Sequence, residues 1–166
     1  HQQNGERRNY SGGFAGNGWT NDTFYPKYPI IANQADFMFR DSKIANINVP
    51  IRVLSNSFQE AFRASFVENV QEIILTQPTN VLSWMSYASF IKEIRITCEG
   101  TGCLGRTDVT CTVDTLSHDS LVSIGNALQD LVPLGKTFIW NIGSTNKEKL
   151  AIAEIAIATQ KGWTVK

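Results

Sequence analysis

The sequence predicts an α/β solenoid, with parallel strands on one face and helices or helical turns on the other. The chain has 166 residues, of which 42% are hydrophobic, and this suits a single domain with a sizeable core. Strand-like and helix-like stretches alternate in its C-terminal half, which favours parallel pairing with right-handed crossovers. The main observation is a short apolar pattern that occurs three times, as Ile44-x-x-Ile47-x-Val49, Val70-x-x-Ile73-x-Leu75 and Ile91-x-x-Ile94-x-Ile96.

Charge and hydropathy exclude several classes of partner. Fifteen Lys and Arg residues balance fifteen Asp and Glu residues, so no net field favours nucleic acid or an anionic membrane. We find no apolar stretch approaching the roughly 18 residues of a membrane-spanning helix, and we expect no membrane insertion. Because the chain begins at His1 rather than methionine, we expect either a processed product or an engineered fragment, and in both cases any signal peptide would already be missing.

The three cysteines do not form a disulfide framework, because their number is odd and their spacing is loose. Cys98 and Cys111 continue inward-facing strand patterns, so we expect both to be small buried apolar groups. Cys103 lies in a glycine-flanked loop, and a bridge between Cys98 and Cys103 remains an alternative. His1 and His118 are the only histidines, and no second cysteine pair exists, so we expect no metal and no cofactor.

Residues 1–36 differ in composition from the rest. Glycines and prolines alternate there with aromatic residues, which favours turns and irregular chain that still buries large rings. One interpretation is a ligand-binding aromatic surface. The interpretation we prefer is an irregular cap that covers the first unit of the solenoid. The solenoid then occupies residues 37–166, and cap and solenoid together form a single structural domain.

The repeating unit has two competing alignments. The first, on the apolar pattern, gives two unequal intervals, whereas the second, on Phe39-Arg40-Asp41-Ser42 and Phe62-Arg63-Ala64-Ser65, gives an interval of 23. A three-residue insertion between Val67 and Ile73 would reconcile them. In either alignment the unit is a short helix or helical turn carrying an aromatic residue, then a corner, then a strand. The candidate helical turns are residues 57–62 and 80–88.

The C-terminal third predicts three strands and two helices. Alternating apolar residues predict strands over 109–113 and 138–142, with a last strand from Trp163. Leu121, Ile124, Leu128 and Leu131 form the stripe of a helix of about four turns, for which Ser117 or Thr115 is the N-cap. A second helix follows Ile142 and is opened by a capping box at residues 145–148. Its apolar run spans residues 150–157, and Gly162 ends it.

These patterns resemble the BspA-like leucine-rich repeat proteins of gut bacteria and their prophages. The matching units are Phe39 with the first apolar pattern, Phe62 with the second and Phe90 with the third. Residues 120–128, 142–150 and 157–164 are similar to the terminal units of such proteins, and residues 6–10 and 25–29 to their leader. The resemblance implies a short leucine-rich-repeat-like solenoid on a cell surface or virion. It implies binding to a protein or glycan, with no catalytic residues to transfer.

We find no set of residues in the sequence with the pattern of a catalytic or calcium site. Ser117-His118-Asp119 contains the residue types of a triad, but consecutive residues at a helix start point in different directions, so capping is the simpler role. Glu99, Asp108, Asp114 and Asp119 lack the dense spacing of a calcium loop, and we take them as solvated charges. We therefore expect a protein that is not an enzyme.

The expected function is a binding module that uses the outward positions of the strands. The alternatives are a merely soluble strand surface, or a structural part of a phage tail or cell-surface layer that packs through its N-terminal aromatic segment or the strand at Trp163. The candidate ligand-binding residues are Asn46, Asn48, Glu72, Ile74, Glu93, Arg95, Thr97, Thr110, Thr112, Ile139 and Asn141.

Overall fold

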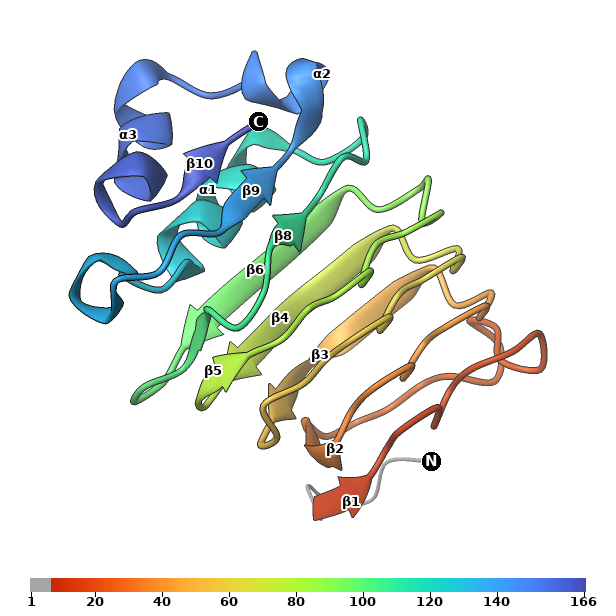
Figure 1. Cartoon of the computed structure of the whole chain (residues 1–166). Coiled ribbons are helices and arrows are strands. Elements are labelled where there is room, and N and C mark those ends of the chain that lie inside the picture. The colour runs from red at the N-terminus through yellow and green to blue at the C-terminus, as the bar shows by residue number, and fades with distance from the viewer. Residues whose placement is uncertain (1–6) are drawn as a thin grey trace.

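The computed structural model describes residues 7–166, and the first six residues of the predicted cap, His1 included, lie outside the described residues. Within this range the chain is α/β, and its larger sheet has the order β1-β2-β3-β4-β6 with every adjacent pair parallel. Figure 1 shows these strands side by side in chain order. Their bounds are Arg7–Asn9 for β1, Ile30–Gln34 for β2, Asn46–Val53 for β3, Asn69–Leu75 for β4 and Glu93–Cys98 for β6.

The strand register supports the second alignment, which places Phe62 opposite Phe39, over the first. Ile47 pairs with Val70, at the interval that also separates the two phenylalanines, and Val70 pairs with Ile94. The first alignment, which placed Val70 opposite Ile44 rather than opposite Ile47, is therefore wrong. A register shift follows Ile47 in β3 and Val70 in β4, so each of these strands carries an irregularity at the same level. Pro50 lies inside β3 just after the shift, opposite Glu72 of β4.

The aromatic residues of each unit lie on turns that contain left-handed residues, so the prediction of a short helix or helical turn there is wrong. Residues 36–41, 59–64 and 82–87 form consecutive turns with equal spacing along the chain, and residues 11–16 form a similar segment. We call these four the turn segments. Two positions four residues apart in each have a left-handed φ, which interrupts a right-handed helix. They are Gly12 and Gly16, Phe37 and Asp41, Glu60 and Ala64, and Ser83 and Tyr87.

A ladder of backbone hydrogen bonds joins each turn segment to the next. The donors are alternate amides of one segment, and the acceptors are alternate carbonyls of the following segment, at 2.8–2.9 Å. This is the pattern of a parallel pair built from turns rather than from strands. The bonds run from Gly12, Phe14 and Gly16 to Asp36, Met38 and Arg40, from Phe37, Phe39 and Asp41 to Gln59, Ala61 and Arg63, and from Glu60, Phe62 and Ala64 to Leu82, Trp84 and Ser86.

The core lies between the sheet and the turn segments. Phe14, Phe39 and Phe62 are buried and stacked, with ring centroids 5.3 Å and 5.8 Å apart, and they belong to the same cluster as the inward residues of the strands. Ile47, Ile73 and Ile94 are all buried in that cluster. Large apolar side chains from both layers are thus removed from water together, which is the main stabilisation of the fold.

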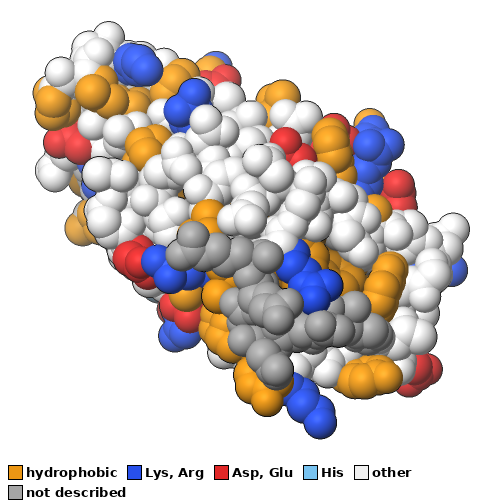
Figure 2. Space-filling model, turned by 90° about the horizontal axis from the view of Figure 1, so that it is seen from below, with side chains coloured by type: hydrophobic (Ala, Val, Ile, Leu, Met, Phe, Trp, Pro, Cys, Tyr) orange, Lys and Arg blue, Asp and Glu red, His pale blue; other side chains and the backbone are white. Residues whose placement is uncertain are grey.

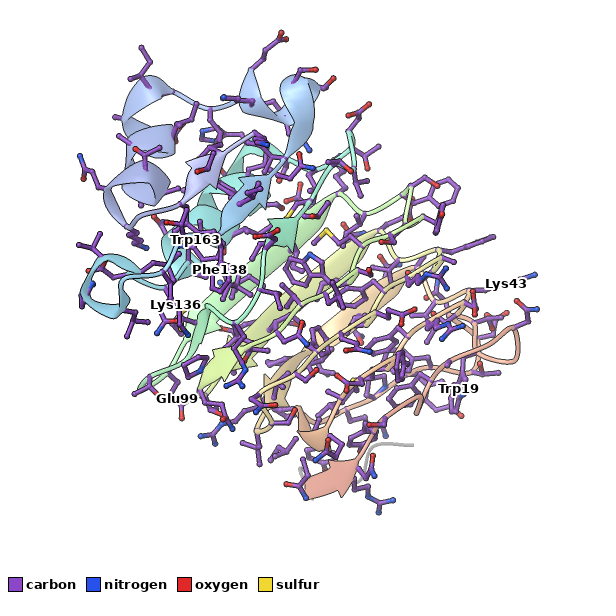
Figure 3. The ribbon with its side chains drawn as sticks, in the orientation of Figure 1. Trp19, Lys43, Glu99, Lys136, Phe138 and Trp163 are labelled. Atoms are coloured by element: carbon purple, nitrogen blue, oxygen red, sulfur yellow. The ribbon has the colours of Figure 1, made fainter. Side chains whose placement is uncertain are left out.

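Shorter strands continue the layer of the turn segments. Pro78–Thr79 (β5) pairs with Cys103–Leu104 (β7), and Val109–Thr110 (β8), Ile139–Asn141 (β9) and Thr164–Val165 (β10) form a separate parallel sheet in the order β10-β9-β8. In Figure 1 this sheet lies in front of the level of the larger one. In Figure 3, Phe138 and Trp163 lie beside each other, and their ring centroids are 5.6 Å apart.

The helix α1 (His118–Ala127) follows β6 at the edge of the larger sheet. Ser117 is its N-cap, as predicted, and accepts a hydrogen bond from the Ser120 amide. The helix is shorter than expected, because Leu128 is extended and forms a parallel bridge to Leu104. Gly125 lies against the Trp140 ring, where an added Cβ would come within 2.9 Å of the ring.

The predicted second helix is divided in two. A short helix, α2 (Gly143–Lys147), is separated from α3 (Ile152–Gln160) by the extended residue Ala151. The predicted capping box at residues 145–148 does not form, because Thr145 lies inside α2, and instead Glu154 accepts a hydrogen bond from the Ala151 amide. Gly162 adopts the predicted left-handed conformation after α3. A 3₁₀ turn, Val132–Leu134, follows α1.

The N-terminal segment is less irregular than expected, since it supplies both β1 and β2. Tyr10, Phe14 and Phe24 are buried, and Tyr25 and Tyr28 are exposed. Figure 2 views the molecule from this side and shows hydrophobic, basic and acidic side chains interspersed over the described surface. At the same end the Lys43 amide donates a hydrogen bond to the Trp19 carbonyl at 3.0 Å, and both residues are labelled in Figure 3.

Candidate binding site: a groove beside α1

An open groove of about 910 Å³ runs across the outward faces of β3, β4 and β6 and is bounded by α1. Successive side chains of a strand point to opposite faces, so the residues between the buried Ile and Val positions form its floor. The helix is wider than a strand, and because it follows β6 at the sheet edge it stands beyond the sheet surface and forms a wall. The groove is thus a shelf of parallel strands closed on one side.

Polar side chains in two rows form the floor. The first row is Asn46, Asn69 and Glu93, which occupy the same register position on β3, β4 and β6. Asn69 Nδ2 donates to Asn46 Oδ1 at 2.7 Å, so the two amides orient each other. The second row, which lies where the register shifts, is Asn48, Gln71 and Arg95. Amide groups both donate and accept hydrogen bonds, and they are exposed here.

The wall is attached to the floor by serine hydroxyls. Ser120 Oγ and Ser123 Oγ accept hydrogen bonds from the Ile94 and Ile96 amides of β6 at 2.9 Å and 2.8 Å. These amides would otherwise be the unpaired edge of the sheet. Glu93 Oε2 accepts from Ser117 Oγ at 2.7 Å and from Ser120 Oγ at 3.3 Å. The first turn of α1 is therefore held on the end of β6.

An ion pair between Glu72 and Arg95 lies at the end of the floor near Thr97. Glu72 accepts a short hydrogen bond from the Thr97 hydroxyl, and its Oε1 lies 3.7 Å from Arg95 Nη2. The Arg95 side chain is nevertheless 63% exposed, so its guanidinium retains donors for a ligand. Such exposed pairs contribute little to stability, and Arg95 can be replaced with small cost to the fold.

The structure brings together only part of the predicted binding face. Five of the predicted residues line the groove, and Glu72 adjoins it through Arg95 and Thr97. The prediction of one continuous face is wrong, because β8 and β9 belong to the separate sheet. The residues in the groove are Asn46, Asn48, Glu93, Arg95 and Thr97, Ile74 lies in β4 but does not line it, and Thr110, Thr112, Ile139 and Asn141 lie on or beside the other sheet.

Sequence reasoning missed the middle of the floor and the whole wall. Asn69 and Gln71 follow Asn46 and Asn48 at the interval of the second alignment, so that alignment could have found them. The wall residues had no comparable signal, because α1 looks like an ordinary amphipathic helix. They are Asp119, Ser120, Val122, Ser123 and Asn126.

The triad-like residues at the start of α1 are arranged as a helix cap and an interhelical contact. His118 Nε2 lies 2.8 Å from Glu154 Oε2 and Nδ1 lies 3.1 Å from Asp119 Oδ1, whereas Ser117 Oγ bonds to Glu93 and Ser120. The hydrogen bond to Glu154, followed by that to Asp119, raises the pKa of His118 above its ordinary value. The imidazole thus faces two carboxylates.

The thiols are free and only one is exposed. Cys98 is exposed, contrary to the prediction, whereas Cys111 is buried as expected and Cys103 is buried as well. Burial raises the pKa of Cys103 to about 11 and that of Cys111 to about 12, which keeps both protonated at neutral pH. The alternative of a Cys98–Cys103 bridge does not describe this structure.

Residues 7–166 contain no group of three or more His, Cys, Asp or Glu side chains placed to hold a metal ion. In the same range no helix combines the length and apolarity needed to cross a membrane. Comparison with known proteins adds no relationship: no family model, no curated protein and no solved structure matches this chain.

Proposed function

We propose that the chain is a short leucine-rich-repeat-like solenoid that acts as a non-catalytic binding module for a protein or glycan. The fold part of the proposal is supported by the equal spacing of the turn segments over residues 36–87, and by parallel pairing on both layers. In a solenoid each unit buries its face against its neighbours, so the same backbone bonds recur from unit to unit.

The observation that carries the binding function is the groove beside α1. Its floor presents exposed amide groups on a rigid sheet, and parallel strands hold those groups at fixed spacings. Hydroxyl-rich or amide-rich ligands are recognised by such donor and acceptor pairs, and a preformed surface loses little entropy on binding. A display site outside the cell or on a phage particle, in keeping with the BspA-like resemblance, is part of the same proposal.

The test is to fill the groove without disturbing its support. Asn48→Trp places a large ring on the floor, and Thr101→Trp, in an exposed loop after β6, is the matched control. Both variants and the native chain are applied to a glycan array and to a panel of purified bacterial surface-protein ectodomains. We expect any ligand found with the native chain to be lost with Asn48→Trp and retained with Thr101→Trp. Retention by both variants excludes the groove as the site.

Arg95→Ala refines the experiment, since the Arg95 side chain is exposed and its ion-pair partner is Glu72, which adjoins the groove. Glu93 is unsuitable as a first target because it also holds Ser117 and Ser120. Weaker binding by Arg95→Ala with an unchanged melting temperature supports the assignment of the second row to ligand contact.

A structural or assembly part is the second candidate, and one observation favours it. Phe66 and Phe90 are about half exposed, their ring centroids are 5.6 Å apart, and Lys43 Nζ lies 5.9 Å from the Phe66 centroid. Such an exposed aromatic pair suits contact with another chain. Trp163 does not, because it is buried and donates to the Gln129 carbonyl within the chain. Gel filtration of the chain and of Phe66→Ser tests this role, which predicts an oligomer that the substitution dissociates.

A further inference from the structure

The hydrogen-bond ladder between turn segments stops at the last of them. In each of the three earlier segments, three alternate amides donate to carbonyls of the next segment. The equivalent amides of residues 82–87 belong to Ser83, Met85 and Tyr87. Among residues 7–166 these three amides have no hydrogen-bond partner.

The ladder stops because the chain leaves the stack. Leu104 still pairs with Thr79, and Thr107 Oγ1 reaches Asn80 Oδ1 at 3.4 Å. Beyond that point Thr110 joins β8, whose backbone pairs with β9. The Thr110 carbonyl accepts a hydrogen bond from Trp84 Nε1 at 3.0 Å, and no backbone amide of residues 82–87 pairs with β8. The separation opens a cleft of about 350 Å³ between residues 85–89 and 110–115.

The other layer at the same end of the stack is treated differently. On the sheet side the last amides, those of Ile94 and Ile96, are satisfied by Ser120 and Ser123 of α1. On the turn side the amides of Met85 and Tyr87 border the cleft without such a cap. The backbone amides that pair with the next segment elsewhere in the stack are thus left without a partner at this cleft. A backbone amide without a hydrogen bond costs free energy unless water or a ligand accepts from it.

We propose that this cleft binds an extended peptide segment, whose alternate carbonyls accept hydrogen bonds from Met85 and Tyr87, with Ser83 continuing the row. The assignment follows from what meets the same donors elsewhere in the chain: in all three earlier junctions it is a row of alternate backbone carbonyls. An added chain that completes a backbone ladder is a general mode of peptide recognition.

The walls of the cleft favour a peptide over a small anion. Thr110 and Thr112 are exposed and offer hydroxyls, and Asp114 supplies a carboxylate that repels anions. No Lys or Arg is among the described residues that line the cleft. Tyr87 is 78% exposed at its border, and Arg63 lies over its ring at 5.4 Å from the centroid. The ring can therefore cover one side of a bound segment.

This inference concerns a different site from the groove beside α1, so the two proposals fail independently. The probe is a synthetic peptide with the sequence of residues 57–66, because this segment presents the carbonyls of Gln59, Ala61 and Arg63 to an earlier donor row. A scrambled peptide of the same composition is the control. Amide hydrogen exchange of the full chain is followed by NMR, with Phe62 and Ala64 as internal references that are already bonded.

In the free chain we expect the Met85 and Tyr87 amides to exchange faster than those of Phe62 and Ala64. With the peptide at about ten times its dissociation constant, their exchange should slow about tenfold, and the scrambled peptide should have no effect. Thr112→Arg, which fills the cleft, should abolish the slowing, and Thr101→Arg outside the cleft should preserve it.

Three results overturn the proposal. One is unchanged exchange of Met85 and Tyr87 in the presence of the peptide. Another is slowing that persists in Thr112→Arg, which moves the peptide to a different surface. The third is slowing that appears without peptide as the protein concentration is raised, since the occupant is then a second copy of this chain.

Discussion

His118 Nε2 lies 2.8 Å from Glu154 Oε2, and this contact joins the first turn of α1 to the first turn of α3. The pKa of Glu154 is lowered by the hydrogen bond from the Ala151 amide and then by that from His118. The same pair raises the pKa of His118. The wall of the groove is thereby linked to the C-terminal helix by a bond that depends on pH.

Stability should fall as pH rises through the pKa of His118. A raised pKa means that the protonated ring stabilises the fold fully below its ordinary value of 6.5, and that this stabilisation is lost above the pKa of the folded state. We therefore expect the melting temperature to decrease from about pH 6 to about pH 8.5 more in the native chain than in His118→Gln. Parallel melting curves for the two proteins would contradict this role.

Loss of a serine hydroxyl on α1 should leave an edge amide of β6 without its hydrogen-bond acceptor. In Ser123→Ala the Ile96 amide loses its acceptor, and we expect a cost of about 1–3 kcal/mol in the free energy of unfolding. Ser144→Ala, at an exposed position of α2, is the matched control and should change stability by less than about 0.5 kcal/mol. Urea unfolding of both variants makes the comparison, and equal midpoints would show that water replaces the hydroxyl at no cost.

Glycine should be tolerated at a turn position where the native residue has a left-handed φ. Ala64 has φ 55°, which costs a non-glycine residue about 1–2 kcal/mol, whereas glycine loses about 0.5–1 kcal/mol more conformational entropy. Ala64→Gly should therefore leave the protein equally stable or up to about 1 kcal/mol more stable. Ala45→Gly, half-buried and without a positive φ, should destabilise it by about 0.5–1 kcal/mol. The same sign for both changes would refute the strain at residue 64.

The three thiols should react in the order of their exposure. Cys98 is exposed, and Cys111 is buried with its pKa raised to about 12. With iodoacetamide in mild excess, mass spectrometry should find Cys98 modified first and Cys111 only under unfolding conditions. Modification of Cys111 at the rate of Cys98 in the folded chain would mean that the core beside Trp140 opens readily.

The parallel strands could be predicted because their apolar residues alternate. The patterns at Val70–Leu75 and Ile91–Ile96 lie within about two residues of the observed strands, Asn69–Leu75 and Glu93–Cys98. The turn segments were misread, since an aromatic residue followed by Arg and a small residue also suits a helical turn. What decides the conformation is the left-handed φ of ordinary residues such as Glu60 and Ala64, which local propensity does not predict.

The candidate site was only half predictable for a related reason. Asn46 and Arg95 follow from strand alternation, whereas the wall depends on where α1 packs, and this is settled by tertiary contacts such as those of Ser120 and Ser123. The expected face failed at Thr110 because the chain leaves the stack there and begins another sheet. Periodicity indicates which side of a strand is polar, and it gives no information on which strands share a sheet.

The equal spacing of residues 36–41, 59–64 and 82–87 bears on how this gene can change length. A duplication or deletion of one whole interval keeps the amide donors of each turn segment opposite the carbonyls of the next. A gain of one or two codons misaligns both layers at once. Because α1 terminates the larger sheet, such growth can occur on the N-terminal side and lengthen the shelf while its wall remains in place.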